Sequence, residues 1–206
     1  GLSALAGSLV AFSASAEITM SGGASVGVTN TNDTRASAYY MGDSINFTLS
    51  GETDNGLTIT QKIELEGGVD NQSTAIAGDF GTLTYHKHGG DSVMSGWDDK
   101  TPNAYEESWD IVTGADTGTR VSGGGGDNMF TYTSPTVSGA TVTASYLNAS
   151  DAVTDVSYSD YGVTYTGMDG LTVGYGEGDV ENVTNTKSSE STLFGKYAIG
   201  SFTVGI

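Results

Sequence analysis

The chain has 206 residues, no cysteine and a formal net charge of −18. The absence of cysteine excludes disulfides and cysteine–zinc sites, and the negative charge excludes a nucleic-acid partner, whose phosphates would be repelled. The 31 glycines, with many Thr, Ser and Asn, disfavour helices. Disorder is the alternative for an acidic chain, but 11 Tyr, 6 Phe and regular alternation favour a folded all-β protein.

Residues 1–16 have the features of the last part of a secretory signal peptide. The run from Leu2 to Phe12 is apolar or small, and Ala14-Ser15-Ala16 is a small-x-small cleavage site before the charged Glu17. We expect export machinery to cleave after Ala16, with a short buried helix as the alternative. No positively charged region precedes this run, and the chain ends within a strand-like segment at Ile206. We therefore expect sequence to be missing at both ends.

From Glu17 onwards, apolar and polar residues alternate with the period of two that is typical of strands. In residues 17–29 the apolar series runs from Ile18 to Val28, and about 9–11 residues suffice for a tilted strand to cross a bilayer. No apolar run reaches the roughly 18 residues of a spanning helix. The expected strands are eleven: 17–29, 44–52, 57–66, 74–78, 82–88, 127–134, 140–148, 156–167, 171–176, 191–199 and 201–206.

The connections between these segments alternate between short and long. Asp54-Asn55-Gly56 is a strong hairpin turn, because Asn and Gly accept positive φ. By contrast, residues 30–41 and 67–72 read as longer polar loops. Short turns at one end and long loops at the other are typical of outer-membrane barrels, which have an even number of strands in bacterial single chains. The sequence therefore predicts a transmembrane antiparallel up-and-down β-barrel occupying residues 17–206 and lacking its C-terminal part.

The longest connection, about residues 89–126, has no regular period and is strongly acidic. Between Asp91 and Arg120 it carries 7 acidic residues against Lys100 and Arg120. Structureless insertions of this length are usually functional. We expect it to fold into the lumen and narrow the pore, where carboxylates favour cations. The expected constriction carboxylates are Asp98, Asp99, Glu106, Glu107 and Asp110.

Patterns that suggest other chemistry do not complete a site. Gly23-Ala24-Ser25-Val26-Gly27 has the esterase spacing, but it lies inside an alternating strand and no helix follows. His86 and His88 are spaced for one strand face, yet no acidic or cysteine pattern completes a metal site. We expect no enzymatic activity, no cofactor and no metal.

Two motifs flank the acidic segment. Gly78-Asp79-Phe80-Gly81-Thr82 precedes it, and Asp127-Asn128 with Tyr132-Thr133-Ser134-Pro135 follows it. With a long loop between strands five and six, they resemble the general bacterial porins, trimeric barrels of about sixteen strands in the Gram-negative outer membrane. The resemblance implies a homotrimer in the outer-membrane bilayer, a channel for passive diffusion of small hydrophilic solutes and ions, and a basic wall opposite the loop. Lys62 and His86 are the candidates for that wall.

Two classes of function remain open on the sequence alone. One is a cation-preferring pore; the other is a secreted acidic β-rich binding protein or adhesin, with calcium as a possible ligand. A barrel in lipid turns its apolar face outward and a soluble sandwich turns it inward, and alternation cannot decide which face is inside. For the pore, Lys62 and His86 point into the lumen. The residues expected to face outward are Ile45, Phe47, Leu49, Leu57, Ile59, Ile63 and Leu65.

Overall fold

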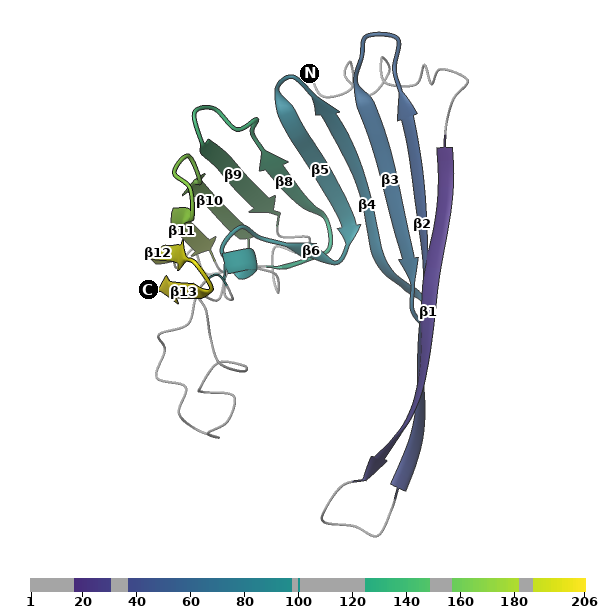
Figure 1. Cartoon of the computed structure of the whole chain (residues 1–206). Helices are drawn as coiled ribbons and strands as arrows, with labels where there is room; N and C mark the ends of the chain where they lie inside the picture. The colour runs from purple at the N-terminus through teal and green to yellow at the C-terminus, as the bar shows by residue number, and fades with distance from the viewer. Residues whose placement is uncertain (1–16, 31–36, 98–99, 101–124, 149–156, 182–186) are drawn as a thin grey trace.

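The computed structural model describes residues 17–30, 37–97, 100, 125–148, 157–181 and 187–206. These residues form one antiparallel sheet of 11 strands and a second sheet of 2 short strands (Figure 1). In the large sheet each strand pairs with the next strand of that sheet along the chain, so the topology is up-and-down. No described helix is long and apolar enough to cross a membrane.

The strands of the large sheet follow one another with β6, η1 and β7 inserted after the fifth. Their bounds are β1 (Glu17–Asn30), β2 (Ser37–Glu52), β3 (Thr58–Leu65), β4 (Val69–Gly78), β5 (Gly81–His88), β8 (Met129–Thr133), β9 (Ala140–Leu147), β10 (Ser157–Tyr165), β11 (Leu171–Glu181), β12 (Lys187–Ile199) and β13 (Phe202–Gly205). The small sheet pairs β6 (Gly90–Asp91) with β7 (Gly125–Gly126), and η1 (Ser95–Trp97) is a single 3-10 turn.

Each of the eleven predicted segments corresponds to a strand of the large sheet, but the strands are longer than expected where polar loops were predicted. β1 continues to Asn30 and β2 begins at Ser37, so the first connection is much shorter than residues 30–41. The reason is pairing across the hairpin, where Val28 lies opposite Tyr39 and Asn30 opposite Ser37. Cross-strand hydrogen bonds are made by the backbone, so polar side chains do not prevent them.

Five short connections, β2–β3, β4–β5, β8–β9, β10–β11 and β12–β13, lie together at one end of the sheet, and the remaining connections lie at the other end (Figure 1). Each short connection contains a glycine with positive φ, the conformation that tight turns require and that other residues disfavour. These glycines are Gly56, Gly81, Gly139, Gly170 and Gly200. The predicted longer loop over residues 67–72 is wrong, because β4 begins at Val69 and pairs with β3, which leaves only residues 66–68 between the two strands.

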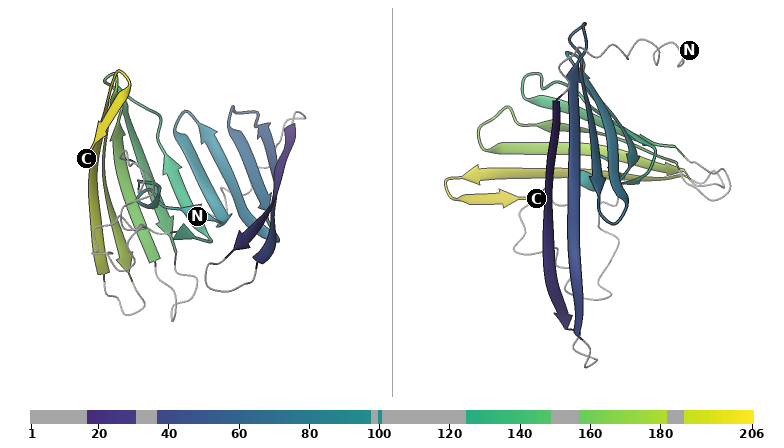
Figure 2. Two further views of the ribbon diagram at one scale, coloured as in Figure 1. Left: turned by 60° about the horizontal axis from the view of Figure 1, so that its bottom comes forward. Right: turned by 90° about the vertical axis from the view of Figure 1, so that its right-hand side faces the viewer.

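The sheet is curved, with η1 in its concavity (Figure 2), and its two faces differ in chemistry. The convex face exposes large apolar side chains, among them Ile18 at 67%, Leu193 at 69% and Phe202 at 74%. The apolar residues of β2 and β3 form one face across the pair, because Ile45 pairs with Leu65 and Phe47 with Ile63. Exposed apolar residues over most of a sheet indicate a face that meets lipid or protein rather than water.

The predicted outward set lies on this convex face. Register places Leu49 opposite Gln61 and Gly51 opposite Ile59, continuing the row that contains Phe47 and Ile63. Leu57 precedes β3 in the turn, and Ile59, which pairs with Ile76 of β4, is 9% exposed. None of these residues packs under a second sheet among the residues that the structure describes.

Candidate functional site

The acidic segment leaves the sheet and returns to it through the small sheet β6–β7. Gly90 pairs with Gly126 and Asp91 with Gly125, so the two ends of the segment are held side by side. Glycine is needed at position 90, because a Cβ there would lie 2.9 Å from the Gly126 carbonyl oxygen and 2.9 Å from Cβ of Met129. Both ends of the segment are therefore fixed where it departs from the wall.

Asn128, in the motif that follows the acidic segment, connects the end of the segment to β5. Its φ is 65°, and its side-chain oxygen accepts hydrogen bonds from the Tyr85 hydroxyl at 3.0 Å and the Lys87 ammonium at 3.0 Å. Asn is among the few residues that tolerate the left-handed conformation. The preceding residue, Asp127, binds the His88 ring through its Oδ2 at 2.9 Å. The Asp-Asn motif thus acts as the joint between the segment and the sheet.

The other two motif stretches meet at the short-turn end. The Tyr132 hydroxyl donates a hydrogen bond to the Phe80 carbonyl oxygen at 2.6 Å. Gly81 has φ of 105°, and a Cβ on it would lie 2.2 Å from the Thr133 carbonyl oxygen. The turn before the segment and the strand after it are consequently one packed unit, which explains why these residue types occur together.

The first part of the segment packs against the inner wall. Met94 and Trp97 are 0% and 8% exposed, and the Trp97 ring meets the Phe194 ring edge-on, with centroids 5.2 Å apart. Gly162 of β10 and Gly176 of β11 leave the space, since a Cβ on either would lie 2.6 Å or 2.8 Å from the Trp97 ring. The glycines of β10 and β11 therefore leave room on the inner wall for the Trp97 side chain of η1.

Lys62 and His86 share the face on which Trp97 packs. Lys62 pairs with Ser73 of β4, and Ser73 pairs with His86, so the two basic side chains lie in one cross-strand row. His86 is hydrogen-bonded through Nε2 to the Thr131 hydroxyl at 3.0 Å. That these residues line a permeation path stays a prediction. The five expected constriction carboxylates and the cleavage site at Ala16 lie outside the described residues.

A groove of about 340 Å³ separates the start of the segment from the wall of β5, β8 and β9. It is lined by charged and hydroxyl side chains from both sides, including His86, Asp91, Lys100 and Thr143. The His86 and His88 rings have separate hydrogen-bond partners, and no group of three or more metal-ligating side chains occurs in the described part of the chain.

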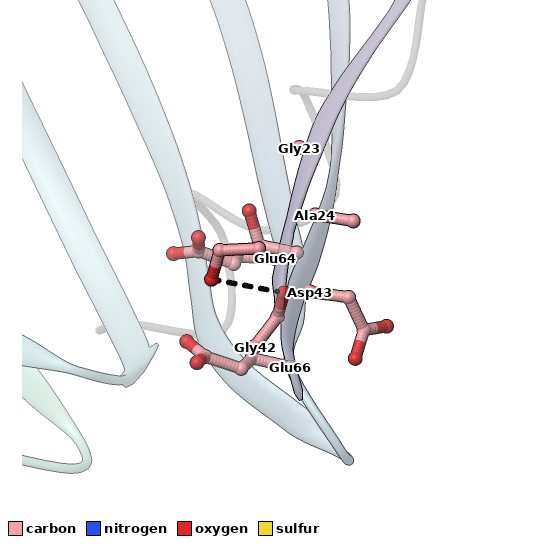
Figure 3. A pocket seen from close by; sticks show the side chains of 8 residues that line it. Gly23, Ala24, Gly42, Asp43, Glu64 and Glu66 are labelled. Carbon is pink, nitrogen blue, oxygen red and sulfur yellow. Dashed lines mark hydrogen bonds between the residues drawn. The ribbon is translucent and has the colours of Figure 1, made fainter. Parts of the chain in front are cut away.

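Glu64 is an inner-wall carboxylate that the sequence reasoning did not select. It accepts hydrogen bonds from the side-chain amides of Asn71 at 2.8 Å and Asn46 at 3.4 Å. Figure 3 shows that Glu64 and Glu66 project to one side of the sheet and Asp43 to the other, beside a shallow hollow of about 400 Å³. The signal was available, because Glu64 follows Lys62 by two residues and therefore shares its face of the strand.

Solved structures share the fold, among them the following three. The chain matches OmpTdeltaL8, a loop L8 deletion mutant of an outer membrane protein of Vibrio cholerae, at 14% identity and a TM-score of 0.63, over 92% of this chain and 67% of that chain. It matches a porin refined at 1.8 Å resolution at 18% identity and a TM-score of 0.63, over 92% and 66% of the two chains. An anion-selective porin from Comamonas acidovorans matches at 16% identity and a TM-score of 0.62, over 93% and 66%. The chain thus spans about two thirds of the length of these structures.

The sequence itself matches the family described as Gram-negative porin over residues 1–206, whereas no curated protein matches it. This match sets aside the secreted adhesin that composition had left open. It confirms the family resemblance, the β-barrel fold, the outer-membrane location and the expectation of a protein that is not an enzyme. The chain belongs to the Gram-negative porin family.

Proposed function

We propose that the protein forms a water-filled channel through the outer membrane for passive diffusion of small hydrophilic solutes and ions. The observation that carries this proposal is the packing of Met94 and Trp97 on the inner wall, which starts the acidic segment inside the concavity. The apolar convex face and the polar inner face support it, because a lipid-embedded barrel that holds water needs that distribution.

We further propose that the channel prefers cations. The segment from 91 to 120 has 7 acidic and 2 basic residues, and Glu64 and Glu66 add carboxylates on the inner side of the sheet. In a narrow aqueous passage between low-dielectric walls, carboxylates concentrate cations and repel anions. A porin of similar fold is described as anion-selective, so the fold leaves the preference to the side chains that line the passage.

In this proposal, Asp98, Asp99, Glu106, Glu107 and Asp110 form the acidic side of the constriction. Lys62 and His86 form the opposite side, on the inner faces of β3 and β5. Opposed charges across a narrow passage produce a transverse field that orders water and separates the paths of cations and anions. Cations would follow the acidic side.

The reversal potential across a salt gradient tests this function. The five carboxylates are replaced together by Asn or Gln in the full-length protein, reconstituted in a planar bilayer. The reversal potential should move toward the value for anions, most strongly at low ionic strength, where screening is weakest. The control replaces three carboxylates of the convex face, Asp43, Glu177 and Asp179, in the same way. An unchanged reversal potential at low salt would place the segment away from the permeation path.

We also propose a homotrimer and removal of residues 1–16 on export. Gln61 and Thr74 lie directly opposite each other on the convex face, and such a polar pair is accommodated better at a subunit interface than in lipid. Detergent-solubilised full-length protein should have the mass of three chains, and a monomer would contradict the trimer.

Sequencing of the mature N-terminus should begin at Glu17, if residues 1–16 are removed on export. Retention of Leu2–Phe12 would contradict the cleavage.

A further inference from the structure

We propose that Asp160 is the positioning residue that fastens the start of the acidic segment to the inner wall. Asp160 lies on β10, two residues before the glycine on which Trp97 rests. In this assignment it does not touch the permeating solute but sets where the constriction begins. The inference rests on the proposed channel function, which supplies the reason for holding the segment in place.

The Asp160 carboxylate is buried, with 5% of the residue exposed, and it is the acceptor for the segment's own backbone. The Met94 main-chain N–H donates to its Oδ2 at 2.8 Å, across 66 residues of sequence. The Ser145 hydroxyl of β9 donates to its other oxygen, Oδ1. A hydrogen bond to an ionised acceptor is roughly twice as strong as a neutral one. Losing the donor would leave a buried charge under-solvated, which is a large penalty.

Contacts within the wall also orient the carboxylate. Tyr158, which is 2% exposed, places its hydroxyl 3.3 Å from Asp160 Oδ2 and donates to Glu190 of β12 at 2.7 Å. The ring reaches Glu190 by crossing Gly178, where a Cβ would lie 2.3 Å from the Tyr158 hydroxyl oxygen. Ser145 of β9 and Tyr158 of β10 therefore meet at Asp160, and Glu190 of β12 fixes the Tyr158 hydroxyl, so the acceptor site is built by the wall itself.

A single hydrogen bond at Met94 positions the whole turn, because the turn is closed on itself. The Trp97 N–H donates to the Met94 carbonyl oxygen at 3.0 Å, and the Gly96 N–H to the Ser92 carbonyl oxygen at 3.1 Å. The Ser92 hydroxyl also accepts from the Ser95 N–H at 3.2 Å. Fixing the Met94 backbone therefore places the Trp97 ring over the glycines of β10 and β11.

Asp160 has no cationic partner within the described part of the chain, where the ion pair found is His88 with Asp127. Its charge is balanced by hydrogen-bond donors, one of which belongs to the segment. An acceptor of the same shape but without charge should therefore keep most of the attachment. Comparing Asp160→Asn with Asp160→Ala therefore separates the loss of the negative charge from the loss of the hydrogen-bond acceptor.

The test follows the exposure of Trp97 in full-length protein in which Trp109, the other tryptophan of these 206 residues, and any tryptophan outside them are replaced by Phe. In Asp160→Ala the acrylamide quenching constant of Trp97 should rise toward its value in unfolded protein. In Asp160→Asn, whose Oδ1 can still accept from Met94 while its amide donates to Ser145, the constant should stay near that of the parent. Asp179→Asn removes the same charge from the convex face and should have no effect.

A second variant acts from the segment side and leaves the wall intact. Met94→Pro deletes the N–H donor and should raise the quenching constant, whereas Met94→Leu keeps the donor and should not. Migration without heating on a denaturing gel verifies that each barrel is folded. If both Asp160→Ala and Met94→Pro give folded barrels with parental quenching, Asp160 does not fasten the segment.

Single-channel conductance separates this inference from the function on which it rests. Asp160→Ala should change the conductance, and Asp160→Asn should leave it close to the parent value. Raised quenching together with unchanged conductance would support the attachment and contradict the proposed constriction. Parental quenching in the folded variants would overturn the attachment whatever the conductance.

Discussion

Replacing Trp97 by alanine should detach the start of the acidic segment from the inner wall while the barrel remains folded. Trp97 is 8% exposed and rests on Gly162, Gly176 and the edge of Phe194. It contributes no hydrogen bond to the ladder of the large sheet, so the strands keep their pairing. The perturbation is therefore local to the segment.

The expected magnitude follows from the buried area that is lost. Truncating a buried tryptophan to alanine costs about 3–5 kcal/mol, of which the edge-to-face contact with Phe194 accounts for about 0.5–1.5 kcal/mol. Because about 1.4 kcal/mol corresponds to a factor of ten, the detached population should rise by about a hundredfold to a few thousandfold. Phe194→Ala should act in the same direction.

Trypsin cleavage after Lys100 measures this population. The Lys100 N–H donates to the Trp97 carbonyl oxygen at 3.3 Å, and a protease needs this backbone released before it can bind. When opening and closing are fast compared with cleavage, the cleavage rate follows the open population. The product is identified by mass, at low protease concentration and in detergent.

Leu193→Ala is the matched control. Leu193 is 69% exposed on the convex face, whereas its neighbour Phe194 is 5% exposed beneath Trp97. Leu193→Ala should leave the cleavage rate unchanged. Equal cleavage rates at Lys100 in Trp97→Ala and the parent would refute the packing of the segment against this wall.

Two glycines provide further predictions. Gly176→Ala should displace the segment and alter single-channel conductance, since the added Cβ would lie 2.8 Å from the Trp97 ring and 2.9 Å from the Met94 sulfur. Gly195→Ala is the control, because the atom nearest to its added Cβ would be 3.9 Å away. Equal conductance in the two variants would contradict this. Gly81→Ala should lower the yield of folded barrel for two reasons. A φ of 105° costs about 1–3 kcal/mol in residues other than glycine. The added Cβ would also lie 2.2 Å from the Thr133 carbonyl oxygen. Gly68→Ala meets nothing within 4 Å and should fold normally, as measured by heat-modifiable gel migration.

The sequence by itself determined the number and order of the strands and the position of the acidic segment between the fifth and sixth. Alternation with period two is a local signal, so it can be read along one strand without knowing the partner. The turn motif at Gly56 is equally local, because its positive φ depends on the turn and an added Cβ there would meet nothing within 4 Å. For the same reason the outward row of β2 and β3 could be predicted from alternation.

The tertiary structure decided which face is concave, how far the first hairpin extends and where the segment attaches. Tyr39 pairs with Val28 before the predicted start of the second strand at residue 44, because a neighbouring backbone lies within reach, which side-chain polarity does not reveal. Asp160 looks like an ordinary polar residue in an alternating strand. Its carboxylate accepts a hydrogen bond from Met94, 66 positions earlier, and Gly178 of the adjacent strand leaves room for the Tyr158 hydroxyl beside it. Such contacts depend on register and curvature, which arise only when all the strands pair.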